Sequence, residues 1–105
     1  MGELRGLSAL VTGGGTGIGL AIAKRFHGEG AFVTICGRRA HVLREAALAI
    51  HPEGERVLAF AADITAEAEV AALVERAVEK AGRLDILVNC AGPMRIHKAP
   101  EDTTL

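Results

Sequence analysis

The most informative segment of this chain is Thr12-Gly13-Gly14-Gly15-Thr16-Gly17-Ile18-Gly19. It follows the apolar run Ser8-Ala9-Leu10-Val11 and leads into a second apolar segment, from Leu20 onward, that is spaced as in a helix. A strand that enters a helix through a glycine-rich turn is a common setting for binding a diphosphate, because glycines permit a tight turn and a close approach. The helix N-terminus adds unpaired N–H groups and the positive end of its dipole. The sequence therefore predicts an anion-binding strand–turn–helix unit.

Three further elements follow the glycine-rich turn. Gly37-Arg38-Arg39 ends the second apolar run, Asp63-Ile64 follows the third, and Asn89-Cys90-Ala91-Gly92 follows the fourth. The glycines are spaced as T-G-x-x-x-G-x-G and not as G-x-G-x-x-G, because Leu20 stands where the second pattern needs a glycine. In this combination the chain resembles the N-terminal, cofactor-binding half of the short-chain dehydrogenase/reductase family. The resemblance covers essentially the whole chain.

The alternation of short apolar runs with amphipathic stretches predicts an α/β fold with parallel strands. We expect strands over residues 8–12, 31–36, 56–61 and 85–89, and helices over residues 17–28, 41–50 and between an N-cap at Thr65 and a terminating Gly82. The resemblance implies the fold β-α-β-α-β-α-β, a Rossmann-like doubly wound parallel sheet with strand order 3-2-1-4. The resemblance implies that residues 1–105 are a partial NAD(P)-binding Rossmann domain whose catalytic half is absent from this chain.

The third expected helix has the clearest amphipathic pattern. Its apolar positions form a continuous stripe made of Val70, Leu73, Val74, Ala77, Val78 and Ala81. Apolar residues at this spacing face the core of a protein. We therefore expect Leu73 and Val74 to pack on the sheet.

Composition argues against several classes of function. A net charge of −1 and the absence of Trp and Tyr offer neither a basic surface nor a stacking platform for nucleic acid. No apolar run approaches the roughly 20 residues that span a bilayer, and the N-terminus has no secretory signal. The four His residues are not spaced as metal ligands. We therefore expect a cytoplasmic protein without a metal, a membrane or a nucleic-acid partner.

The two cysteines, Cys36 and Cys90, stand at the ends of the second and fourth expected strands. With the expected strand order they lie two strand spacings apart, about 9.6 Å, which exceeds the roughly 7 Å limit for a disulfide. Both are therefore expected to be free thiols. We expect Cys90 to be a buried strand-end thiol with a raised pKa and no role as a nucleophile.

The resemblance assigns cofactor-binding roles to the glycine-rich turn. Gly13 makes the tight turn, Gly17 admits the pyrophosphate, and Gly19 lets the helix pack closely. Ile18 contributes its backbone N–H. The hydroxyls of Thr12 and Thr16 contact the cofactor or brace the loop, with ordinary loop hydroxyls as the alternative.

The residues after the second strand favour NADP(H) over NAD(H). Relatives that prefer NAD carry an acidic residue there for the ribose hydroxyls, whereas this chain has Gly37 followed by Arg38 and Arg39. Guanidinium groups suit a 2′-phosphate by charge and geometry, and Arg38 can also stack on the adenine. The alternative is that both arginines are merely solvated.

The remaining predicted contacts come from the ends of the third and fourth strands. By resemblance, Asp63 accepts a hydrogen bond from the adenine amino group beside the Ile64 N–H, although Asp63 can instead cap the loop before the third helix. Asn89 braces the central strands, and Ala91 and Gly92 leave room for the cofactor ribose.

The family's chemistry requires a tyrosine as acid/base, with a lysine, a serine and an asparagine, and this chain contains no tyrosine. No catalytic residue is therefore predicted here. The first hypothesis is the cofactor-binding half of an NADP(H)-dependent oxidoreductase that acts on a carbonyl or alcohol and is homo-oligomeric at full length. The second is a dinucleotide- or partner-binding module without chemistry, and the third is an unstable truncation product. The exposed apolar edge of the fourth strand predicts self-association of the isolated chain.

Overall fold

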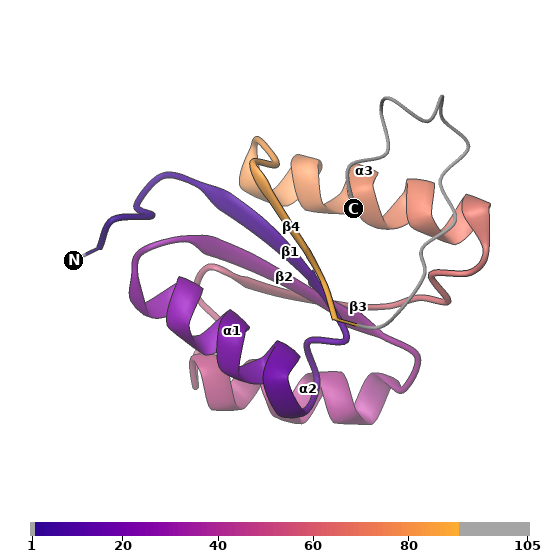
Figure 1. Ribbon diagram of the computed structural model, residues 1–105, viewed down its shortest axis with the longest axis horizontal. Coiled ribbons are helices and arrows are strands. Elements are labelled where there is room, and N and C mark those ends of the chain that lie inside the picture. The colour runs from indigo at the N-terminus through magenta and orange to yellow at the C-terminus, as the bar shows by residue number, and fades with distance from the viewer. Residues whose placement is uncertain (1, 91–105) are drawn as a thin grey trace.

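Four parallel strands form one sheet that carries helices on both faces (Figure 1). The computed structural model describes residues 2–90. The elements, in chain order, are β1 (Ser8–Thr12), α1 (Gly17–Gly28), β2 (Phe32–Gly37), α2 (Ala40–Ile50), β3 (Val57–Ala61), α3 (Glu67–Ala81) and β4 (Ile86–Asn89). The sheet has the order β3-β2-β1-β4. The expected fold class and strand order are confirmed, and every expected boundary lies within one residue of the observed one.

The path of the chain reverses direction at β1. From β1 the chain moves through α1 to β2 and through α2 to β3, and then returns along α3 to β4 on the other side of β1. Because crossovers between parallel strands are right-handed, this reversal places α3 on the face opposite to α1 and α2 (Figure 1). In open α/β sheets, ligands bind at the carboxyl ends of the strands where the order reverses.

The core has one apolar cluster on each face of the sheet. Val11, Val33 and Ile35 are buried on the face covered by α1 and α2. Leu10 and Leu73 are buried on the face covered by α3. All five residues of β1 are buried, since this strand has neighbours on both edges and helices on both faces.

Helix α3 differs from its prediction at its start and along one flank. Its N-cap is Ala66 and not Thr65, because the Thr65 hydroxyl donates to Asp63 Oδ1 at 2.6 Å instead. Leu73 is fully buried as predicted, but the prediction for Val74 is wrong, since it is 36% exposed. Among residues 2–90, α3 is the only helix on its face of the sheet, so nothing covers its flank. Gly82 ends the helix in the left-handed conformation, with φ 85°, as expected.

Candidate functional site

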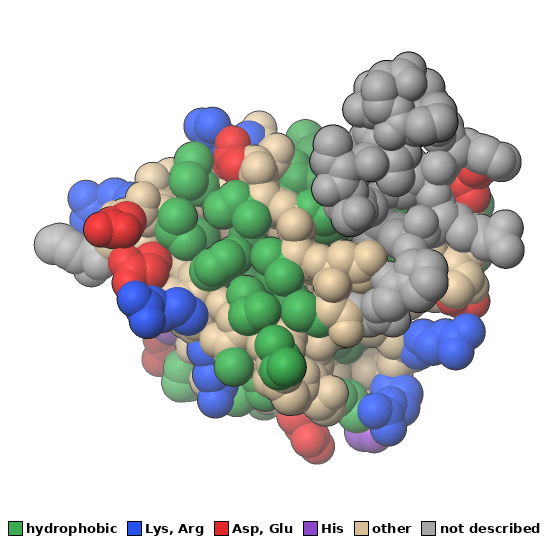
Figure 2. Space-filling view, in the orientation of Figure 1, with side chains coloured by type: hydrophobic (Ala, Val, Ile, Leu, Met, Phe, Trp, Pro, Cys, Tyr) green, Lys and Arg blue, Asp and Glu red, His purple; other side chains and the backbone are tan. Residues whose placement is uncertain are grey.

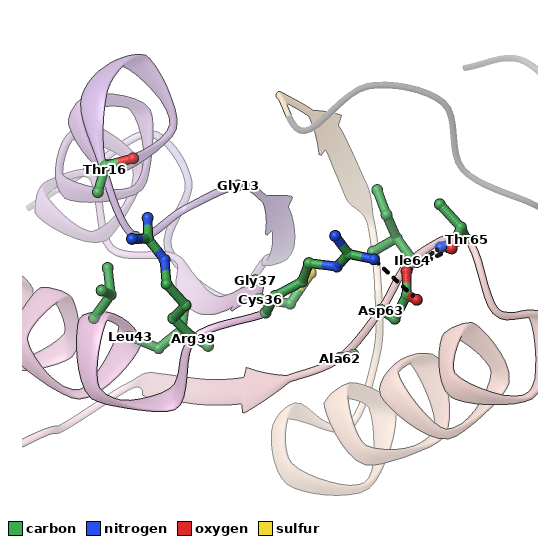
Figure 3. Close-up of a pocket in the computed structure, with 13 residues that line it drawn as sticks. Gly13, Thr16, Cys36, Gly37, Arg39, Leu43, Ala62, Asp63, Ile64 and Thr65 are labelled. Carbon is green, nitrogen blue, oxygen red and sulfur yellow. Dashed lines mark hydrogen bonds and ion pairs between the residues drawn. The ribbon is translucent and has the colours of Figure 1, made fainter.

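A pocket opens at the carboxyl ends of β1, β2 and β3 (Figure 3). Its volume is about 390 Å³. The lining comes from the glycine-rich loop, the β2–α2 connection and the β3–α3 connection. It consists of Gly13, Gly15, Thr16, Cys36, Gly37, Arg38, Arg39, Val42, Leu43, Ala62, Asp63, Ile64 and Thr65. Three segments that are distant in sequence thus meet at the edge of the sheet where ligands bind in such folds.

The glycine-rich loop is held against the end of β2. The N–H groups of Gly13 and Gly14 both donate to the Cys36 carbonyl oxygen, at 2.9 and 3.3 Å. A Cβ on Gly19 would overlap the Gly13 carbonyl, so only glycine lets α1 begin this close to the loop. Gly17 has φ +57°, and a Cβ there would meet no atom within 4 Å. The loop backbone at Gly17 is therefore open to a ligand.

The N-terminus of α1 lies beside this loop, and its first turn contains no acidic side chain that would repel an anion. Thr16 is the N-cap, its side chain makes no capping hydrogen bond, and the first turn contains no Asp or Glu. The N–H groups of the first turn have no intrahelical acceptor, and together with the helix dipole they attract an anion. Ile18 lies in the same turn and is 75% exposed. This end of the helix fits a diphosphate.

The far side of the pocket is organised around Asp63. Asp63 Oδ1 accepts from the Thr65 N–H at 2.9 Å and from the Thr65 hydroxyl at 2.6 Å. Asp63 Oδ2 pairs with Arg38 Nη2 at 3.2 Å. These bonds, with those from Thr65 the largest, lower the pKa of Asp63 to about 2. Asp63 therefore caps the loop before α3, as the alternative expectation stated, and its predicted adenine contact stays a prediction.

Thr12 and Asn89 join β1 to β4. The Thr12 hydroxyl donates to Asn89 Oδ1 at 2.8 Å and accepts from the Cys90 N–H at 3.0 Å. Thr12 is fully buried, and it braces the strand ends without lining the pocket. Ala91 and Gly92 lie outside the described residues.

The two thiols have different surroundings. Both are free, as expected. Cys36 is buried, and burial raises its pKa to about 11. The expectation that Cys90 is buried is wrong, because it is exposed. Cys90 follows the last residue of β4, which has a strand neighbour on one edge only among the described residues, so the sheet covers it poorly.

Several pocket residues were not predicted from the sequence. They are Gly15, Cys36, Val42, Leu43, Ala62 and Thr65. Val42 and Leu43 lie in the first turn of α2, directly after the arginines, and an apolar pair at this place is the signal that could have identified them. Residues 2–90 contain no group of three or more His, Cys, Asp or Glu that could hold a metal ion. No described helix is both long and apolar enough to cross a membrane.

The parallel sheet and the pocket at its carboxyl edge define a nucleotide-binding α/β protein. The family model of the short chain dehydrogenases matches residues 8–104, and the chain therefore belongs to the short-chain dehydrogenase family.

Two reductases are similar to this chain over most of its length. The peroxisomal 2,4-dienoyl-CoA reductase of Arabidopsis thaliana is 40% identical over 88 residues, which are 84% of this chain and 30% of that protein. The 3-ketoacyl-(acyl-carrier-protein) reductase of Brucella melitensis, solved with NADH, is 46% identical with a TM-score of 0.76, over 81% of this chain and 34% of that one.

A second solved structure carries the other nicotinamide cofactor. The F189W variant of actinorhodin polyketide ketoreductase, solved with NADPH, is 38% identical with a TM-score of 0.79, over 89% of this chain and 36% of that one. The chain thus spans about a third of the length of these relatives.

Proposed function

We propose that this chain binds NADP(H) as the cofactor-binding half of an oxidoreductase acting on a carbonyl or alcohol. The observation that carries the proposal is Gly37 at the end of β2, followed by two arginines that line the same pocket. When bound, the nicotinamide ring supplies or accepts the hydride of such a reaction. The residues of this chain bind and orient the cofactor.

The pocket fits a dinucleotide on its own geometry. The backbone around Gly13 and Gly17, with the first turn of α1, would hold the diphosphate, and Gly19 keeps that turn close to the loop. Thr16 adds a hydroxyl at the pocket wall. The adenine would lie toward the β3–α3 connection, between Asp63, the Ile64 N–H and the apolar side chains of α2. Asn89 would brace the ends of β1 and β4 through its bond with Thr12, and Ala91 and Gly92 would leave room for the cofactor ribose.

The preference for a 2′-phosphate rests on the balance of charge in the pocket. Asp63 is the only acidic side chain among the described lining residues, and it is already paired with Arg38. At position 37 there is no carboxylate that could bind the ribose hydroxyls or repel a phosphate. The two solved relatives described above carry NADH and NADPH respectively, so the expected preference for NADP(H) rests on this chain's own residues.

Titration of the 105-residue chain with NADPH and NADH tests the cofactor proposal. A lost hydrogen bond to a charged group costs about 1.5–3 kcal/mol, so we expect NADPH to bind roughly ten- to hundredfold more tightly. The double variant Arg38→Ala plus Arg39→Ala should bind the two cofactors alike. Equal affinities in the unmodified chain, or an unchanged preference in the double variant, would contradict the proposal.

A second candidate is a dinucleotide-binding module without chemistry. The sequence contains no tyrosine, so the proton donor that the family's hydride transfer requires is not part of it. We expect no NADPH oxidation by this chain with a panel of ketones and 3-oxoacyl thioesters. A mock purification serves as the control. Turnover above that control would favour an enzyme that is active by itself. Tight cofactor binding without turnover is expected both for the cofactor-binding half of an oxidoreductase and for a binding module without catalytic activity.

The open edge of β4 supports self-association of this chain. β4 pairs with β1, and among residues 2–90 no strand pairs with its other edge. Figure 2 shows hydrophobic side chains gathered over β4 and the neighbouring surface of α1. Unpaired backbone groups beside an apolar surface favour pairing with a second chain. Sedimentation velocity should show dimers or larger species, and a well-behaved monomer would contradict this.

A further inference from the structure

Two histidines hold one residue of the connection between α2 and β3. The Glu55 carbonyl oxygen accepts from His27 Nε2 at 2.8 Å, and the Glu55 N–H donates to His51 Nδ1 at 3.1 Å. The centroids of the two imidazole rings lie 5.4 Å apart. His27 lies in the last turn of α1, and His51 is the C-cap of α2. These contacts, the histidine clasp, therefore join both helices to the start of β3, at the edge of the sheet opposite to the pocket.

The partners of the two rings fix the roles of their nitrogens. A carbonyl oxygen only accepts, so His27 carries a proton on Nε2, and this proton is present in the cation as well as in one neutral tautomer. A backbone N–H only donates, so His51 Nδ1 carries no proton, which is possible only in a neutral ring. Uptake of a proton therefore leaves the bond from His27 in place but removes the bond to His51.

The residue after Glu55 is held in a strained backbone conformation. Arg56 has φ +61° and is the only non-glycine residue with a positive φ among residues 2–90. A long side chain in this region is costly, and the conformation persists only where its surroundings hold it. Arg56 Nη1 donates to the carbonyl oxygens of His27 and Ala31, at 3.3 and 2.9 Å. The strained residue therefore ties the end of α1 to the start of β2.

We propose that His51 is a proton sensor that opens the histidine clasp as the pH falls through the range in which imidazole titrates. With His51 neutral, Glu55 is fixed at both its N–H and its carbonyl group, and the conformation of Arg56 is imposed on it. A proton on His51 Nδ1 releases the Glu55 N–H. Arg56 then relaxes toward an extended conformation, and its guanidinium leaves the two carbonyl groups. The proposal is independent of any cofactor.

Charges of both signs lie on the elements packed against His51. Helix α1 contributes His27 and the pair Arg25–Glu29, which is closed at 3.1 Å. The other charged groups are exposed and lie on the connection and on α2 itself; they are Glu53, Glu55, Arg56, Arg44 and Glu45. Salt screens exposed charges, so the bond from the Glu55 N–H is the specific contact that protonation of His51 changes.

Amide hydrogen exchange, followed by NMR on the 105-residue chain, measures the state of the clasp at Glu55. One pH unit below its ordinary midpoint of about 6.5, an imidazole is roughly tenfold more often protonated than neutral. Because only neutral His51 closes the clasp, the protection factor of the Glu55 N–H should fall roughly tenfold between pH 7.5 and pH 5.5. The protection factor of Ile35, which is fully buried in β2, should stay unchanged.

Three histidine variants separate the sensor from other effects of acid. His51→Asn places an amide oxygen near the position of Nδ1 and accepts a hydrogen bond at any pH, so the Glu55 N–H should stay protected at both pH values. His51→Ala removes the acceptor and should leave it unprotected at both. His41→Asn removes an exposed histidine from the first turn of α2 and is the matched control, which should keep the pH response of the unmodified chain.

The backbone coupling constant of Arg56, which reports φ, tests the coupled relaxation. It should change over the same pH range in the unmodified chain and stay constant in His51→Asn. A pH-independent protection factor at Glu55 in the unmodified chain, or an unchanged pH response in His51→Asn, would overturn the proposal. An equal loss of protection at Ile35 would show that acid loosens the whole protein, and would overturn the assignment to His51 as well.

Discussion

Gly19→Ala is expected to destabilise the protein and to weaken cofactor binding, although alanine is the better helix former. A Cβ at position 19 would overlap the carbonyl group of Gly13, and it would stand 3.2 Å from Gly14 Cα. These are backbone atoms, so no side-chain rotation relieves the contact, and the loop must move. Gly28, at the other end of the same helix, is the matched control, because a Cβ there meets nothing within 4 Å.

The magnitude follows from three contributions. Overpacking a close contact costs about 1–3 kcal/mol. Displacing the loop also endangers the bonds from Gly13 and Gly14 to the Cys36 carbonyl, each worth about 0.5–1.5 kcal/mol. The gain in helix propensity offsets at most about 1 kcal/mol. We therefore expect Gly19→Ala to lower the free energy of unfolding by roughly 1–4 kcal/mol, and Gly28→Ala to raise it by up to about 1 kcal/mol.

Urea unfolding followed by circular dichroism measures both free energies, and NADPH titration measures the functional effect. Gly28 lies nine residues further along α1, about 13.5 Å at 1.5 Å per residue, so Gly28→Ala should leave the affinity unchanged. Gly19→Ala should reduce it at least tenfold, because the displaced loop is the proposed diphosphate site. The reasoning is refuted if Gly19→Ala is as stable as the wild type and binds NADPH equally well.

Three further outcomes follow from burial and charge. Leu73→Ala should lower stability by about 2–5 kcal/mol, because Leu73 is fully buried, and an unchanged urea midpoint would contradict its core position. The Asp63 carboxyl should titrate near pH 2 by carbon NMR, because its pKa is lowered from the ordinary value of 3.8. Its stabilising effect is therefore complete above about pH 4 and is lost as the pH falls through 2. Thr65→Val should raise this midpoint, and a wild-type midpoint near 3.8 would contradict the hydrogen bonds. A thiol reagent at pH 8 should modify Cys90 rapidly and Cys36 slowly, since Cys36 is buried with a pKa raised to about 11; equal rates would exclude this difference.

The elements nearest the glycine-rich loop could be predicted to the residue. β1 and α1 have the expected bounds, because an apolar run ends in glycines on one side and the helix runs to Gly28 on the other. These signals are local, because they depend on the backbone conformations that glycine allows and not on contacts with distant residues. The strand order came from resemblance, since the hydrophobic pattern alone does not fix which strands are neighbours.

Features that depend on tertiary neighbours could not be predicted from the sequence. Val74 and Leu73 both belong to the apolar stripe, yet Val74 is 36% exposed and Leu73 is fully buried. Periodicity identifies the apolar side of a helix, but the width of the buried stripe depends on what packs beside it. The same holds for Cys90, whose exposure depends on the coverage of the sheet edge and not on its own sequence neighbours.

The arrangement at Asp63 connects the fold to the predicted cofactor contact. The sequence around Asp63 is compatible with two alternative roles, a loop cap and an adenine acceptor. Thr65 and Arg38 together bring three donors to the carboxylate, whereas two carboxylate oxygens can accept about four. One acceptor position is therefore left for an amino group such as that of adenine, and the roles are compatible. Because the existing bonds fix the carboxylate before a ligand arrives, binding there would require little reordering of the side chain.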